Sequence, residues 1–306
     1  MKCVKVLKKD AQKTKLALIK AKVFAENYSI PKDTAHIYFP VTKKISGFTL
    51  VGKVCKKMVQ KPKISVHSFD HIGDIVIVAE NATKKDAKQL LNGNNIKVVL
   101  RKKGIHSGEF RTQKLEWVAG EKRKETVYRE NGVEMKLNVE TCYFSPRLGT
   151  ERMRIAQLVK KGEKILVLFS GVGPYPLVLA KHSKASFIIA VEKNPNAHRY
   201  ALENCRKFPQ IILYNMDAKQ FHYPEKFDRI LMPLPHSAEE FLDVAVKLLK
   251  EKGMIHFYSF AREEEIPDKV LSLIRTKVAK FKVIRFVKCG QSAPGKYRVC
   301  VDFIPQ

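Results

Sequence analysis

Two glycines, Gly171 and Gly173, stand where a ligand could approach the main chain. They lie in ILVLFSGVGPYP, residues 165–176, which we predict as a buried strand, a tight turn and the start of a helix. Glycine lets the backbone come close to a ligand, and open α/β sheets bind ligands at the carboxyl ends of their strands. On its own a GxG pair is weak evidence, because many tight turns that bind nothing also contain it.

An acidic residue follows this turn at the sequence distance typical of residues that bind the ribose of a nucleotide. Glu192 ends the next predicted strand, in IIAVEKNP. An acid about 20 residues beyond a glycine turn is placed to accept hydrogen bonds from ribose hydroxyls. The alternative is that Glu192 only stabilises the positive end of a helix dipole. We favour the ribose role because the turn and the acid occur together.

The turn itself argues against a dinucleotide. It lacks the third glycine of GxGxxG and continues with Pro174 and Tyr175. A proline at the helix start leaves fewer amides for a pyrophosphate. A cofactor with a ribose and no phosphates suits this turn better, and S-adenosylmethionine is such a cofactor.

The next two predicted strands end in further candidates. Asp217 follows the third strand, where an acid can meet an adenine amino group, although a simple turn aspartate is nearly as good a reading. Pro233 and Pro235, in MPLPH, follow the fourth strand and form a stiff platform beside the expected pocket. Pro233 has no N–H, so it offers its carbonyl.

Arg147 is the candidate for binding a substrate. It lies in CYFSPRLGTERMR, residues 142–154, in the loop before a predicted helix. Arg152 and Arg154 can be ordinary surface charges of that helix. This explanation fits Arg147 less well, because Arg147 lies in the loop before the helix.

The whole chain carries far more positive charge than solubility requires. Its 306 residues include 58 Lys+Arg and 30 Asp+Glu, a formal net charge of +28, with 45% apolar residues. This composition indicates a globular protein with a polyanionic partner. Residues 1–140 carry 30 basic and 14 acidic side chains (+16) and residues 141–306 carry 28 and 16 (+12), so both halves could contact one polyanion.

Other classes of protein are less compatible with the sequence. The N-terminus lacks an apolar signal region, and neither a transmembrane span nor a basic amphipathic helix stands out, which argues against secretion and a membrane surface. The six cysteines form no CxxC pair and no zinc spacing, so we expect free thiols in the cytoplasm and no metal.

The elements that must position these residues divide the chain in three. Residues 1–62 read as a small α+β unit with a helix in KKDAQKTKLALIKAKVF, and a linker is predicted near residues 59–66. Residues 67–138 read as a second α+β unit. Its Trp117 could stack on a base, but a core or inter-domain position is favoured.

From residue 139 to residue 306 the pattern alternates strand and helix. Seven strand candidates, the last two without a helix between them, predict a doubly wound α/β sheet with an antiparallel last strand.

Taken together, these motifs resemble the archaeal and eukaryotic tRNA (guanine-37-N1)-methyltransferase family, which includes relatives in the wybutosine pathway. The resemblance rests on YFSPRLGTERMRIA, FSGVGPYP, AVEKNP, DRILMPLPHSAEEFLD, IHFYSF and SAPGKYRVCVDF, with FDHIGDIVIV and GEFRTQKLEWVAGE upstream. It is most secure over residues 67–306.

The resemblance implies a fold, a reaction and a set of site residues. The fold would be a class I methyltransferase domain after two small α+β domains, with S-adenosylmethionine as cofactor. The N-terminal domain would reach the tRNA body. Cofactor contacts would come from Phe169, Gly171, Gly173, Tyr175, Glu192, Asp217, Pro233 and Pro235. The protein would be a cytoplasmic monomer that acts on the anticodon loop of tRNA and not on DNA or membranes.

Arg147 would sit at the target guanine. Loss of the N1 proton moves negative charge onto O6, and a fixed guanidinium would stabilise that charge. The base must also leave the stack of the anticodon loop. The general base is not placed: Glu192 is better used for ribose, and Glu151 is a weaker alternative.

Two departures from the family pattern keep other readings open. Val167 stands where the family usually has an acid, and Pro233-Leu234-Pro235 stands where it usually has Asn-Leu-Pro. These changes are compatible with transfer of an aminocarboxypropyl group to a wyosine precursor, or with a catalytically weakened RNA-binding homologue.

Overall fold

The computed structural model describes residues 1–57, 69–91 and 95–306. The linker predicted near residues 59–66 lies outside the described residues. The chain divides into two compact units, Met1–Lys63 and Ile64–Gln306.

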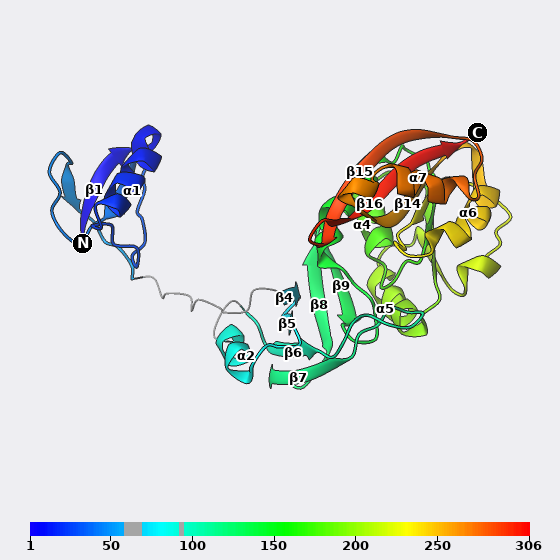
Figure 1. Cartoon of the computed structure of the whole chain (residues 1–306), viewed down its shortest axis with the longest axis horizontal. Helices are drawn as coiled ribbons and strands as arrows, with labels where there is room; N and C mark the ends of the chain where they lie inside the picture. The colour runs from blue at the N-terminus through cyan, green and yellow to red at the C-terminus, as the bar shows by residue number, and fades with distance from the viewer. Residues whose placement is uncertain (58–68, 92–94) are drawn as a thin grey trace. The chain divides into compact units, whose positions relative to one another are not determined.

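The first unit is a three-stranded antiparallel sheet with one helix (Figure 1). Its elements are β1 (Lys2–Leu7), α1 (Ala11–Lys20), β2 (His36–Pro40) and β3 (Leu50–Gly52), with β1 in the centre of the sheet. Val4, Leu18 and Phe39 form its core. The helix forms where the lysine-rich periodicity predicts it. However, Leu16 is 59% exposed, because this ten-residue helix buries only the narrow face that carries Leu18.

The second unit begins with a four-stranded sheet in the order β4-β5-β6-β7. Its elements are β4 (Phe69–Ile72), β5 (Ile75–Val78), α2 (Lys84–Leu91), β6 (Val98–Lys102) and β7 (Leu115–Gly120). Thr83 caps α2, since its Oγ1 accepts the Asp86 N–H at 3.2 Å. Trp117 is 41% exposed on the sheet, so the prediction of a core position for it is wrong.

A hairpin of β8 (Glu125–Glu130) and β9 (Val133–Asn138) follows this sheet. Asn131 and Gly132, both with positive φ, form its tight turn, as expected of an Asn-Gly pair between two strands. Met135 on β9 is buried with Ile155 and Val178, which lie on two helices that cover one face of the large C-terminal sheet, so the hairpin packs against this helical layer. Figure 1 shows it next to the four-stranded sheet.

The large sheet has seven strands in the order β12-β11-β10-β13-β14-β16-β15. β16 is antiparallel to both of its neighbours, while β10–β14 pair in parallel, which confirms the predicted doubly wound sheet with an antiparallel last strand. The strands are β10 (Lys164–Leu168), β11 (Phe187–Glu192), β12 (Ile211–Asn215), β13 (Phe227–Met232), β14 (Leu249–Arg262), β15 (Phe281–Ala293) and β16 (Lys296–Pro305). The helices are α3 (Gly149–Leu158), α4 (Pro174–His182), α5 (Pro195–Cys205), α6 (Leu242–Leu248) and α7 (Asp268–Arg275).

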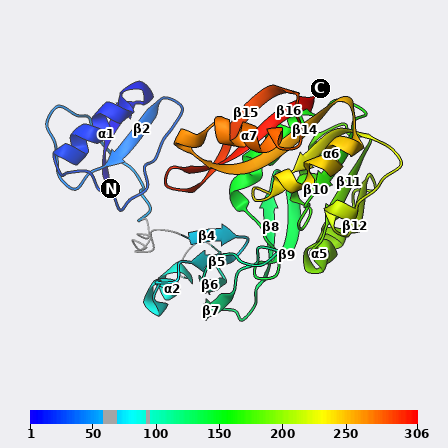
Figure 2. The same cartoon turned by 45° about the vertical axis from the view of Figure 1, so that its right-hand side comes forward.

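Side-chain alternation along the strands builds a core on each face of this sheet. Leu166 and Leu168 of β10 pack in one core with residues of α6 and α7. Figure 2 shows these two helices and the strands of the large sheet. Ile165 and Val167 pack on the face with α3 and α4. Val167 therefore fills the core at the position where the family pattern has an acid. With both faces covered, ligands can approach only at the strand ends.

Candidate functional site

A cavity of about 440 Å³ opens at the carboxyl ends of β10–β13. The structure brings six of the eight predicted cofactor residues to it, and they come from four separate strand ends: Phe169, Gly171, Glu192, Asp217, Pro233 and Pro235. Open α/β sheets bind their ligands at this edge.

Glu192 ties the glycine turn to the end of β11. Its carboxylate accepts the Gly171 N–H and the Asn194 N–H, each at 2.7 Å. Burial raises the pKa of Glu192 above its ordinary value, and backbone hydrogen bonds from Asn194, Gly171 and Lys193 oppose that shift. A carboxylate has about four acceptor sites, so Glu192 can still accept a hydrogen bond from a ligand in the cavity.

Asp217 lies at the next strand end with a cation beside it. It accepts hydrogen bonds from the Lys193 Nζ at 2.8 Å and from the Lys219 N–H at 2.8 Å. The bond from Lys193 is the main reason that the pKa of Asp217 lies below its ordinary value. Lys193 also pairs with Glu109. The Phe169 and Phe241 rings meet edge to face at 4.7 Å and add an apolar wall to the cavity.

The other two predicted cofactor residues do not line the cavity. Gly173 caps α4 with φ +90°, and a Cβ there would lie 3.0 Å from Cys205 Sγ, so this glycine serves the packing of the turn against α5. Tyr175 is buried, and its hydroxyl donates to the Tyr258 hydroxyl at 3.0 Å. The first turn of α4 points it into the core rather than toward the strand ends, which corrects its expected cofactor contact.

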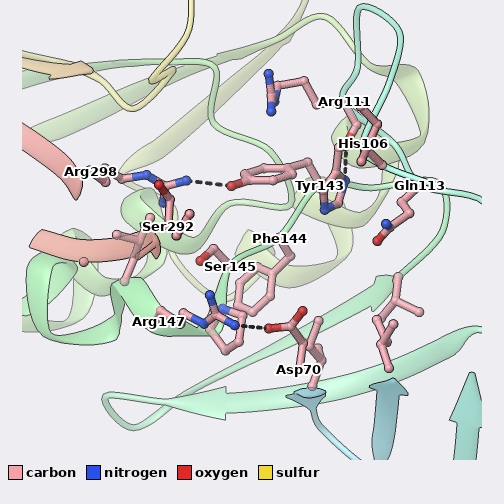
Figure 3. A pocket seen from close by; sticks show the side chains of 18 of the residues that line it. Asp70, His106, Arg111, Gln113, Tyr143, Phe144, Ser145, Arg147, Ser292 and Arg298 are labelled. Carbon is pink, nitrogen blue, oxygen red and sulfur yellow. Dashed lines mark hydrogen bonds and ion pairs between the residues drawn. The ribbon is translucent and has the colours of Figure 1, made fainter. Parts of the chain in front are cut away.

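A second cavity of about 620 Å³ adjoins the first (Figure 3). The two share Arg111, Tyr143 and His236, which therefore lie at their junction. The cationic side chains that line the second cavity are Lys102, Arg111, Arg147, Lys296 and Arg298. Asp70 is the only carboxylate among its lining residues, so the cavity is suited to an electron-rich or anionic ligand.

Arg147 lines this second cavity but not the first. Its side chain is 56% exposed, and it donates to Asp70 at 2.7 Å. The other oxygen of Asp70 accepts from the Lys102 Nζ at 2.9 Å. Asp70 lies on β4, so this ion pair links the four-stranded sheet to the loop that precedes α3.

Sequence reasoning missed Arg111, which lines both cavities. It lies in the loop between β6 and β7, which closes with a bridge between Ser107 and Thr112, and its φ is +48°. Its carbonyl is bonded to His106 Nδ1 at 2.9 Å, which helps to fix this unusual backbone. The two glycines of GIHSGEFR, followed by a cation, are the signal in the sequence that indicates a loop here.

Arg298 and His236 complete the junction. Arg298 is 8% exposed and donates to the Tyr143 hydroxyl at 2.7 Å, while its buried Nε finds no partner among the described residues. The His236 ring packs on Phe260 at 4.9 Å. Burial and then the nearby cations, Arg111 first, lower the pKa of His236, so its imidazole is neutral at pH 7.

Two other clusters lie outside both cavities. Glu151 is buried and pairs with Arg154 at 2.7 Å. His256, Cys300 and Asp302 have the donor atoms of a metal site. However, Asp302 is held by Arg154 at 2.7 Å and by His256 at 2.6 Å. These contacts indicate a structural ion-pair network. Among the described residues, no helix is long and apolar enough to cross a membrane.

Comparisons with known proteins match the chain along most of its length. Family models match as the TRM5/TYW2 methyltransferase domain over residues 126–285, the tRNA methyltransferase 5 N-terminal domain over 3–49 and the TYW2 N-terminal domain over 50–123. The Pyrococcus abyssi tRNA (guanine(37)-N(1))-methyltransferase Trm5b is 33% identical over 98% of each chain. A tRNA(Phe) (4-demethylwyosine(37)-C(7)) aminocarboxypropyltransferase from Methanocaldococcus jannaschii is 30% identical over 76% of this chain and 96% of that protein.

Solved structures show the same likeness. The crystal structure of Pyrococcus abyssi Trm5b superposes with a TM-score of 0.76 at 31% identity, covering 99% of each chain. A complex of aTrm5 with tRNALeu gives a TM-score of 0.76 at 28% identity, again over 99% of each chain. A Pyrococcus horikoshii TYW2 structure with MeSAdo gives a TM-score of 0.67 at 27% identity, over 79% of this chain and 92% of that one.

Proposed function

The chain belongs to the TRM5/TYW2 methyltransferase family, and from this premise we propose that it transfers a methyl group from S-adenosylmethionine to N1 of guanosine 37 in the anticodon loop of tRNA. The observation that carries the proposal is the pair of adjoining cavities. One has the acids and rings that an adenosine needs, the other is cationic, and they meet at Arg111, Tyr143 and His236.

The first cavity fits a nucleoside cofactor without phosphates. The Gly171 N–H, which could face a phosphate, is donated instead to the Glu192 carboxylate, and that carboxylate would repel a phosphate. Glu192 would accept hydrogen bonds from the ribose hydroxyls, and Asp217 would accept one from the adenine amino group. The Phe169 ring and the platform of Pro233 and Pro235 would pack against the remaining apolar surface of the cofactor. When bound, S-adenosylmethionine supplies an electrophilic methyl group.

The second cavity fits a guanine that has left the anticodon stack. Negative charge develops on O6 as the N1 proton leaves, and a guanidinium stabilises it. Arg111 is the better placed of the two loop arginines, because it lines both cavities and so lies where the base and the methyl group must meet. Arg147, held by Asp70 at the side of the second cavity, would position the base or its phosphate.

The distribution of charge supports tRNA as the partner. Residues 1–140 carry a net charge of +16 and residues 141–306 carry +12. We propose that residues 1–62 form a domain that binds the tRNA body, that residues 67–138 form a middle domain, and that residues 139–306 form the catalytic domain. We further propose that the protein acts as a monomer in the cytoplasm, on tRNA rather than DNA.

Incubation with an unmodified tRNA and isotopically labelled cofactor, followed by mapping of the modified nucleotide, tests this proposal. Label on N1 of guanosine 37 is expected. Label at another nucleotide, or no label with tight tRNA binding, would refute it, and the latter outcome would favour a catalytically weakened RNA-binding homologue.

Transfer of an aminocarboxypropyl group is the second candidate. It is favoured by Pro233, which stands in place of the usual Asn, and by the 30% identity to an aminocarboxypropyltransferase. The two reactions differ in which carbon on sulfur faces the nucleophile. Mass spectrometry of tRNA that carries a wyosine precursor separates them, because the added mass is that of either one methyl group or the larger unit.

A further inference from the structure

Two thiols meet within the first unit of the chain. Cys3 lies on β1 and Cys55 lies three residues beyond β3, and their Sγ atoms are 3.4 Å apart. Cys3 is fully buried, whereas Cys55 is partly accessible to solvent. Among the described residues, no other pair of cysteine sulfurs makes such a contact.

The backbone brings these two sulfurs together. Val4 faces α1 and the core, so the preceding residue, Cys3, faces the other side of the sheet. The segment after β3 is fixed on both sides of Cys55. The Lys53 N–H donates to the Met1 carbonyl at 3.0 Å, and the Ser29 N–H donates to the Lys56 carbonyl at 2.8 Å. The thiol contact is therefore part of the fold of this unit and does not depend on a flexible chain end.

We propose that Cys3 and Cys55 are a redox-active dithiol, which exchanges with a low-molecular-weight disulfide such as oxidised glutathione to form an intramolecular disulfide. The Cys55 thiolate attacks the glutathione disulfide, and one glutathione leaves. Cys3 then loses its proton and attacks the Cys55 sulfur, and the second glutathione leaves as a thiolate that takes up a proton. Two cysteine thiols and one glutathione disulfide become one protein disulfide and two glutathione thiols, so two electrons pass to glutathione.

The burial of the two thiols sets the order of these steps. Cys55 is the sulfur that a small disulfide can reach. Burial, and then the contact with Cys55, raises the pKa of Cys3 to about 11, so Cys3 stays protonated and unreactive toward reagents in solution. It reacts only with the sulfur already beside it, and proximity favours that second step strongly.

The disulfide would close a ring that includes nearly all of the first unit. The ring runs from residue 3 to residue 55 of a unit that ends at Lys63. A cross-link across so long a loop restricts the unfolded chain strongly, so oxidation should raise the melting temperature of this unit by at least about 10 °C.

Treatment of the full-length protein with glutathione redox buffers tests this proposal. The count of free thiols should fall from six to four, with one cross-linked peptide joining Cys3 to Cys55 and a mass loss of two hydrogen atoms. The amount of protein with this disulfide should exceed the amount with a stable glutathione adduct at Cys55 by at least about tenfold. Six remaining thiols, a persistent adduct at Cys55, or a disulfide between other cysteines would overturn it.

Matched variants keep the test independent of folding defects. Cys55→Ser replaces the partly exposed thiol, and Cys3→Ala replaces the buried one. Both should lose the disulfide and the melting shift. Cys289→Ser is the control, because Cys289 is also partly exposed but donates to the Arg298 carbonyl at 3.4 Å instead of touching a sulfur. It should oxidise like the unmodified sequence. A melting shift that dithiothreitol does not reverse would also contradict the proposal.

Discussion

Removal of the Arg111 guanidinium should slow methyl transfer and spare cofactor binding. A guanidinium about 4 Å from the O6 oxyanion, at an effective dielectric constant of about 20, interacts with it by about 4 kcal/mol. Water that enters the truncated site recovers part of this energy, so the net loss is about 3 kcal/mol. We therefore expect Arg111→Ala to lower the rate by about 10²-fold, in the range found for the loss of one oxyanion donor.

The structure makes Arg111 a clean position for this change. Asp70, the carboxylate that lines the second cavity, pairs with Lys102 and Arg147, so truncation of Arg111 leaves it with its partners. Single-turnover kinetics at saturating tRNA measures the chemical step, and calorimetry measures cofactor affinity. Arg111→Lys is the matched control, since it keeps the charge and loses the planar fork, and it should recover part of the rate. A rate within about threefold of the unmodified protein, or an equal loss of cofactor affinity, would refute this role for Arg111.

Further expectations concern substrate positioning, the cofactor, the tRNA and the core. Arg147→Ala should raise the KM for tRNA and leave cofactor affinity unchanged; reduced cofactor affinity in a calorimetric titration would show that Arg147 is misplaced. Glu192→Gln should weaken cofactor binding by at least about tenfold, because an anionic acceptor for ribose is lost, and unchanged calorimetric affinity would exclude the ribose role. Binding of tRNA, followed by filter binding, should weaken steeply with salt as counterions are released; a flat response would remove the polyanion argument. The pKa of Asp302 is held below its ordinary value, with hydrogen bonds from His256 and Arg154 outweighing burial, so its stabilising contribution is present above about pH 4 and disappears at lower pH. Asp302→Asn should therefore lower the free energy of unfolding at pH 7, measured with denaturant, by about 3 kcal/mol and weaken the fall in stability toward low pH. A decrease of less than about 1 kcal/mol would contradict this.

Local patterns predicted the large sheet because its strands carry their own signals. The runs around Leu166 and Ile189 are apolar on both faces, as parallel strands covered by helices must be. Glu192 and Asp217 were found because each lies at the carboxyl end of a predicted strand: Glu192 ends β11, and Asp217 follows β12. Tyr175 was placed wrongly because the direction of a side chain in the first turn of a helix depends on how that helix packs.

Local sequence patterns did not identify the site residues that come from distant parts of the chain. Arg111 comes to the site from the loop between β6 and β7, and Arg298 comes from β16. Both lie in segments that carry the family resemblance, GEFRTQKLEWVAGE and SAPGKYRVCVDF, but the residue types there do not by themselves indicate a ligand. Their role emerges only when two sheets and the C-terminal strands are packed together. For Trp117 the residue type was misleading. Its large apolar ring suggested a core position, but the residue lies on the edge strand of a small sheet and is exposed.

The position of β16 in the sheet sets the order in which the parts of the site become available during synthesis. β16 follows β15 in the chain but pairs between β14 and β15, so β15 is synthesised before the strand that attaches it to the sheet. A nascent chain that has reached residue 295 already contains the glycine turn and Glu192, but it lacks Arg298 and Asp302. The predicted cofactor residues are therefore synthesised before β16, which supplies Arg298 to the junction of the two cavities and Asp302 to the buried ion pairs.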